Sequence, residues 1–150
     1  MKQDKLNRLF ELLQAKKILF VGIGNALKSD DGIGIYICKS IRQNNKIKTL
    51  IVESGIEKFV GKINSINPEI LILVDCTDFK EEPGFINLLP IEQIQDFTAN
   101  THTISVKRIS EFFKMKTFLL GVQPENVKFG EVFSIKVLNS ADELIDKINA

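Results

Sequence analysis

Cysteine, histidine and tryptophan are scarce in this chain. Its 150 residues include two cysteines, one histidine and no tryptophan. Cys38 falls in a predicted helix and Cys76 directly after a predicted strand, so the two thiols form neither a disulfide framework nor a metal knuckle. A reducing, cytoplasmic setting is the simplest expectation from this cysteine usage.

Charge of one sign and long hydrophobic runs are also missing. Lysine and arginine total 20 against 19 acidic residues, and the net charge of +1 offers no basic field to nucleic acid or anionic lipid. Charged residues interrupt positions 1–16, which excludes the apolar core of a signal peptide, and no apolar run is long enough to span a membrane. We therefore expect neither a nucleic-acid partner nor a membrane partner.

Apolar residues make up 44% of the chain, enough to bury the core of one domain over residues 1–150. Their spacing predicts strands over 18–21, 49–53, 70–75, 85–89 and 117–122. It also predicts helices over 2–15, 32–43, 59–66 and 104–113, and a final helix that Ser134 caps and that extends to Ile148. Residues 90–103 form a long polar segment of the kind that is often functional. The alternation of strands and helices predicts a three-layer α/β/α sandwich with a mostly parallel, twisted sheet.

The glycine-rich turn after the first strand, Gly22-Ile-Gly-Asn-Ala-Leu-Lys-Ser-Asp-Asp-Gly-Ile-Gly34, carries the strongest local signal. Gly22 and Gly24 begin like a dinucleotide-binding fingerprint. Leu27, however, stands where the third glycine should allow the helix and the strand to approach closely. A phosphate-binding loop is excluded as well, because the turn ends in two acids that would repel a phosphate. The turn therefore favours a metal over a nucleotide.

Asp31, Asp75 and His102 are the candidate site residues. Asp31 follows the first strand and Asp75 closes the central one, at the strand ends where open α/β sheets bind ligands. Each residue also has a structural interpretation: Asp30 or Asp31 could cap the next helix, Asp75 could accept loop amides, and a lone histidine is commonly a surface or core residue. Together, two carboxylates and an imidazole suit a divalent first-row metal ion with open coordination positions. The roles of Asp30 and Asp78 stay open.

Five segments resemble the hydrogenase maturation proteases, especially the branch that serves the hydrogenase of formate hydrogenlyase. They are the glycine-rich turn, Leu73-Val-Asp-Cys-Thr-Asp78, Pro83-Gly84, Thr101-His102 and Gly121-Val-Gln-Pro-Glu125. Their order and spacing are similar to the family from Lys17 to the C-terminus. The resemblance implies an α/β/α sandwich and an endopeptidase that removes the C-terminal extension of a nickel-iron hydrogenase large-subunit precursor after nickel insertion.

By position, the resemblance implies that Asp31, Asp75 and His102 are both the catalytic residues and the metal contacts. The precursor would carry the nickel, other divalent ions could occupy the same site, and the protease is expected to act as a monomer. The metal or a carboxylate would polarise the scissile carbonyl or activate water. Two features depart from the family: Glu53-Ser54-Gly55 replaces an Asp-Gly-Gly pattern, which bears on substrate docking, and the helix before Lys17 is longer than usual and has no assigned role.

Other functions stay open at this point. Ser29 or Cys76 could act as a nucleophile, although a nucleophile needs an adjacent base and the chain has one histidine. Asp31 and Asp75 could work as a paired-carboxylate protease without metal. From other classes, the domain could be a nucleotide-binding or regulatory module, or a nickel-dependent escort that binds the large subunit without cutting it.

Overall fold

A five-stranded sheet forms the centre of the protein, as seen in a computed structural model that describes residues 6–96 and 108–150. The strand order is β2-β1-β3-β5-β4. β1, β2, β3 and β5 are parallel, and β4 runs antiparallel to β5. The strands are β1 (Ile18–Ile23), β2 (Ile47–Glu53), β3 (Ile70–Cys76), β4 (Ile86–Pro90) and β5 (Lys116–Val122). The predicted single α/β domain with a mostly parallel sheet is confirmed.

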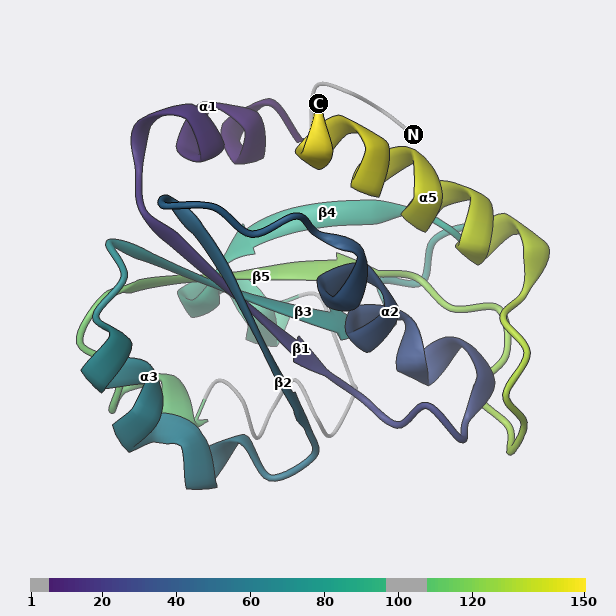
Figure 1. Cartoon of the computed structure of the whole chain (residues 1–150). Helices are drawn as coiled ribbons and strands as arrows, with labels where there is room; N and C mark the ends of the chain where they lie inside the picture. The colour runs from purple at the N-terminus through teal and green to yellow at the C-terminus, as the bar shows by residue number, and fades with distance from the viewer. Residues whose placement is uncertain (1–5, 97–107) are drawn as a thin grey trace.

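Helices cover both faces of this sheet, with α1 and α5 above it and α3 below it in Figure 1. On one face the core contains residues of α1 (Asn7–Ala15), α2 (Ile33–Ser40) and α5 (Ile135–Asn149). On the other face lie α3 (Val60–Ile66) and the short 3-10 helices η3 (Ile56–Phe59) and η4 (Ile91–Asp96). Because side chains alternate along a strand, Phe20 of β1 joins the first core and Leu19 and Val21 join the second. The three predicted layers are therefore present.

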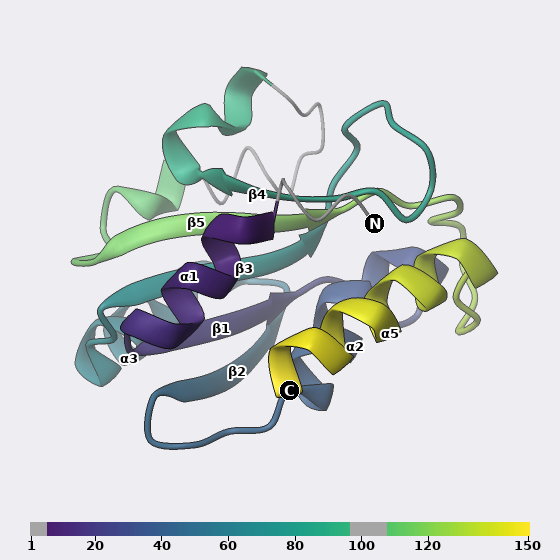
Figure 2. The ribbon, with the colours of Figure 1, turned by 90° about the horizontal axis from the view of Figure 1, so that it is seen from above.

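The N-terminal helix, whose role the sequence left open, is part of the core. Leu6 and Leu9 are fully buried. The guanidinium of Arg8 lies 5.2 Å from the centre of the Phe118 ring on β5, and Figure 2 shows α1 crossing the sheet near β3 and β5. The helix thus covers a part of the sheet that α2 and α5 leave open.

Several predicted boundaries shift. The helix expected over 32–43 is preceded by the 3-10 turn η2 (Ser29–Gly32) and ends at Ser40. The predicted stop before Pro68 is confirmed, because Asn67 ends α3 in the left-handed conformation. Of the helix expected over 104–113, residues 108–110 are helical and a turn follows at 111–112; residues 2–5 and 97–107 lie outside the described part. Within the described residues, no helix has the length and apolar character needed to cross a membrane.

Candidate active site

The candidate site lies at the carboxyl ends of β1 and β3, which are neighbours in the sheet. In the sheet, β2 lies on one side of the β1–β3 pair, and β5 and β4 lie on the other side. The chain therefore builds the sheet in one direction after β1 and in the opposite direction after β3. Open α/β sheets bind ligands at the strand ends where the direction of the chain reverses in this way. The glycine-rich turn leaves β1 at this edge, and Asp75 closes β3 there.

Two glycines fold the turn back onto the end of β3. A Cβ on Gly34 would stand 2.2 Å from the carbonyl oxygen of Val74, so a larger residue would push α2 away from the strand. Gly24 has φ +143°, and a Cβ there would stand 2.0 Å from the carbonyl oxygen of Asp31. Leu27, which stands at the third-glycine position of a dinucleotide fingerprint, is half exposed in the turn, and the close helix–strand approach occurs at Gly34 instead.

The structure brings Asp31 and Asp75 together, as predicted. Asp31 is 6% exposed, and its Oδ2 accepts a hydrogen bond of 3.0 Å from the backbone N–H of Asn25. Asp75 is fully buried, and neither of its carboxylate oxygens has a hydrogen-bond partner among the described residues. Burial raises the pKa of Asp75 well above its ordinary value, and the nearby charge of Asp31 raises it further. The nearby backbone N–H of Cys76 offsets part of the rise without reaching hydrogen-bond geometry.

An unpartnered buried carboxylate is costly for a fold, so its presence suggests a ligand. Carboxylate oxygens are suitable ligands for divalent metal ions, and Asp31 and Asp75 supply two of the three predicted donors. The third, His102, lies outside the described residues. Within the described part, no group of three potential metal ligands comes together. Asp31 and Asp75 therefore fit a cation as part of a donor set that needs further ligands.

Asp30, whose role the sequence left open, is a structural residue. Its buried carboxylate accepts hydrogen bonds from the backbone N–H groups of Glu125, Asn126 and Ser134 and from the Ser134 hydroxyl, at 2.7–2.9 Å. Ser134 is the N-cap residue of α5, as predicted, but its hydroxyl donates to Asp30 and makes no cap hydrogen bond within the described helix. Asp30 thereby ties the glycine-rich turn to the segment before α5.

Gln123 organises the loop after β3, a role that the sequence did not reveal. Its Oε1 accepts from the backbone N–H groups of Phe79 at 2.6 Å and Glu81 at 3.3 Å, and its Nε2 donates to Oδ1 of Asp78 at 3.2 Å. The amide of Lys80 and then Gln123 lower the pKa of Asp78. Asp78, the other open residue, is thus a loop-stabilising acid. The signal available in the sequence was a glutamine directly after the apolar run of residues 117–122.

The two alternative nucleophiles are poorly placed. Ser29 is buried, and its hydroxyl donates to the carbonyl oxygen of Val132 at 2.6 Å. Cys76 is also buried, and burial together with the charges of Asp75 and Asp31 raises the pKa of its thiol, which disfavours the reactive thiolate. The carboxylate pair is therefore the better candidate for chemistry.

The segment that departs from the family pattern still supports the turn. Glu53 ends β2 with φ +49°, and its carbonyl oxygen accepts from the backbone N–H of Gly24 at 2.9 Å. Gly55 follows with φ +79°. Because the contact uses backbone atoms, the exposed side chain of Glu53 remains available at the rim of the site.

Comparisons with known proteins agree with this geometry. A family model described as hydrogenase maturation protease matches residues 35–150. A protein of Methanocaldococcus jannaschii, provisionally named a hydrogenase maturation protease, is 29% identical over 93% of this chain and 90% of its own. The hydrogenase 3 maturation protease of Escherichia coli is 26% identical over 71% and 72% of the two chains. The crystal structure of the [NiFe] hydrogenase maturation protease HycI from Thermococcus kodakarensis shares the fold, with a TM-score of 0.80, 24% identity and coverage of 95% and 97%.

Proposed function

Because the chain belongs to the hydrogenase maturation protease family, we propose that it removes the C-terminal extension of a nickel-iron hydrogenase large-subunit precursor after nickel insertion. The family assignment makes the chain a peptidase. The observation that carries the proposal is the fully buried carboxylate of Asp75 beside Asp31, whose oxygens have no hydrogen-bond partner among residues 6–96 and 108–150. A buried carboxyl group of this kind is retained where a reaction or a ligand needs it.

Nickel belongs to the substrate in this proposal. The precursor presents its bound ion, and Asp31, Asp75 and His102 complete the open coordination positions; other divalent ions could take the same place. Carboxylates and imidazole suit first-row divalent ions, and the lack of a hydrogen-bond partner on Asp75 within the described residues is consistent with such a role. Coordination of the nickel and positioning of the scissile peptide for cleavage then occur in the same binding step.

The carboxylates also supply proton chemistry. Asp75, whose pKa is raised by burial, can hold a proton at a higher pH than an ordinary aspartate and exchange it with water or with the leaving amine. Asp31 is slightly exposed and Asp75 is not, so an entering peptide meets Asp31 first. The bound ion, when present, adds positive charge that polarises the scissile carbonyl.

We further propose that the substrate is the large subunit of a hydrogenase of the formate hydrogenlyase type. The likeness to the hydrogenase 3 maturation protease of Escherichia coli and the motifs of the glycine-rich turn support this choice. We expect the protein to act as a monomer, because the precursor itself provides the second surface of the complex. We also expect it to act in the cytoplasm.

The test is to incubate the purified protein with nickel-loaded and nickel-free precursor and to follow the mass of each. We expect loss of a C-terminal peptide from the loaded precursor alone. Asp31→Asn, Asp75→Asn and His102→Ala should each slow cleavage by about 100-fold or more, as expected for removal of a group that takes part in the reaction. Cys76→Ala is the matched control and should retain activity.

Each contrary result identifies another function. Equal cleavage of both precursors would favour a metal-independent carboxylate pair, and an inactive Cys76→Ala with an active His102→Ala would favour a thiol protease. Binding of the loaded precursor without a cleaved product would indicate an escort. A thermal shift with ATP or NAD and none with precursor would indicate a nucleotide-binding module.

A further inference from the structure

Large apolar side chains are exposed beside the candidate site. Phe129 is 85% exposed, Val132 81% and Ile135 78%, and Leu27 and Val127 are about half exposed. We call these five residues the apolar patch. Scattered single apolar residues are ordinary on a protein surface, but a group of them beside a functional site marks an interaction surface.

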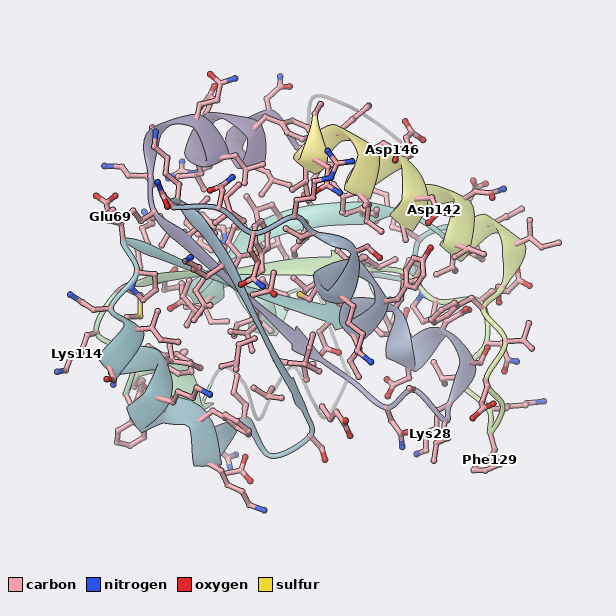
Figure 3. All side chains as sticks on the ribbon, viewed as in Figure 1. Lys28, Glu69, Lys114, Phe129, Asp142 and Asp146 are labelled. Atoms are coloured by element: carbon pink, nitrogen blue, oxygen red, sulfur yellow. The ribbon has the colours of Figure 1, made fainter. Side chains whose placement is uncertain are left out.

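Backbone pairing brings the members of the patch together from two distant segments. Lys28 and Gly130 form an isolated parallel bridge, in which the N–H of Ser29 donates to the carbonyl of Gly130 and the N–H of Gly130 donates to that of Leu27. The Ser29 hydroxyl adds a bond to the carbonyl of Val132. Figure 3 shows Lys28 and Phe129 at the same corner of the molecule. The turn after β1 and the segment before α5 therefore present one surface.

This surface is held in place by the residue next to the candidate catalytic acid. Asp30 accepts four hydrogen bonds from residues 125, 126 and 134, which flank Val127, Phe129 and Val132. Asp31 follows directly in the chain. A partner that binds the apolar patch is consequently held at a fixed position relative to Asp31.

We infer that the apolar patch docks the folded body of the large-subunit precursor, through an apolar protein surface next to the tail that is cleaved. This inference rests on the proposed protease function. A protein that delivers a peptide to Asp31 must approach the turn that also exposes Leu27, so the patch is continuous with the site it would serve.

The charges around the patch favour a protein partner over a membrane or a nucleic acid. Lys28 and Lys128 alternate with Glu125 and Glu131, and the whole chain carries a net charge of +1. A mixed rim around an apolar centre is typical of a protein–protein interface. Docking away from the scissile bond increases affinity and orients the peptide without changing the reacting groups.

The test is a double variant, Phe129→Ser with Val132→Ser, assayed for cleavage and for binding of nickel-loaded precursor. The docking contacts are the same in the enzyme–substrate complex and in the transition state. We therefore expect KM and the dissociation constant of the double variant to rise by about tenfold or more while kcat stays within about twofold. Phe112→Ser is the matched control: Phe112 is 67% exposed but precedes β5, at the opposite end of the parallel strands. Its kinetics should match the wild type.

The outcomes separate this inference from the proposed function. If the wild type cleaves and the folded double variant has an unchanged KM, the docking inference is wrong and the protease function stands. If the wild type binds the precursor without cleaving it and the double variant binds more weakly, the docking inference is supported and the proposed protease function is wrong. A wild-type dimer that the double variant loses, with unchanged precursor kinetics, would assign the patch to self-association. If the double variant has a lowered melting temperature, the single variant Ile135→Ser is compared with the wild type in the same assays of cleavage and binding.

Discussion

Asp75 destabilises the folded protein. It is fully buried, its oxygens lack hydrogen-bond partners in the described part of the chain, and the charge of Asp31 lies nearby. A buried polar group without a partner costs about 1–3 kcal/mol of folding free energy, and more when it is charged. Such a residue is explained by function better than by packing.

We predict that Asp75→Asn stabilises the metal-free protein at neutral pH by about 1–3 kcal/mol while slowing cleavage by about 100-fold or more. An unfolded aspartate loses its proton near pH 4, whereas Asp75 in the folded protein keeps its proton to a much higher pH. Folding of the wild type therefore becomes less favourable as the pH rises between these two pKa values, and the stability advantage of the Asp75→Asn variant should grow over that interval and vanish below it. Urea denaturation from acidic to neutral pH measures this difference.

The control for that experiment is the neighbouring Asp30→Asn. Its carboxylate accepts four hydrogen bonds, so we expect a loss of about 2–4 kcal/mol, the opposite sign. A pH-independent gain for Asp75→Asn would contradict the explanation based on its raised pKa.

The contrast between Asp30 and Asp31 also marks a limit of sequence reasoning for single residues. The convergence of Asp31 and Asp75 was predictable, because the carboxyl ends of neighbouring parallel strands meet at one edge of the sheet. The division of roles between Asp30 and Asp31 was not, because the partners of Asp30 lie about a hundred residues away in the chain. His102 stays a prediction, since it lies outside the described residues.

Among the secondary-structure elements, the position of α2 decides the geometry of the site. Gly34 lies in its first turn, against the carbonyl oxygens of Val74 and Ile23. The turn that carries Asp31 precedes this contact directly, so a displacement of α2 would move Asp31 relative to Asp75.

We predict that Gly34→Ala lowers the free energy of unfolding by about 1–3 kcal/mol and reduces cleavage further than this loss explains. The new Cβ would stand 2.2 Å from a backbone carbonyl in the centre of the sheet, so α2 must move. Gly61→Ala in α3 is the matched control, because no described atom lies within 4 Å of a Cβ there and alanine favours the helix by about 0.5–1 kcal/mol. Denaturation curves and cleavage assays at low temperature test both; wild-type activity in Gly34→Ala would contradict the positioning role.

The elements themselves were largely predictable, because continuous apolar runs such as Ile70–Val74 indicate strands buried on both faces. The apolar period of 3.6 residues also predicted α5 correctly, despite the β-branched residues near its start. The apolar pattern could not predict the tertiary contacts that short segments make. The bridge between Lys28 and Gly130 and the contacts of Gln123 depend on approaches between distant loops that leave no local period.

At the scale of the whole molecule, the candidate functional features lie at one edge. The carboxyl ends of the parallel strands, the carboxylate pair and the apolar patch lie together there, while α1 and the rest of α5 beyond Ile135 contribute to the core. The near-zero net charge adds no long-range attraction for a charged partner. Association with the precursor should therefore depend on contact surfaces more than on electrostatic steering.

We predict that kcat/KM for the nickel-loaded precursor changes by less than about threefold between roughly 50 and 400 mM sodium chloride. Screening weakens attraction between exposed charges, but it has little effect on contacts made by Phe129 and Val132. Sodium sulfate at equal ionic strength strengthens apolar burial and should lower KM for the wild type. The Phe129→Ser, Val132→Ser double variant should lose this response to sulfate, since it lacks the apolar contact. A fall of tenfold or more in sodium chloride would instead show that charged residues such as Lys28 and Lys128 provide the docking contacts.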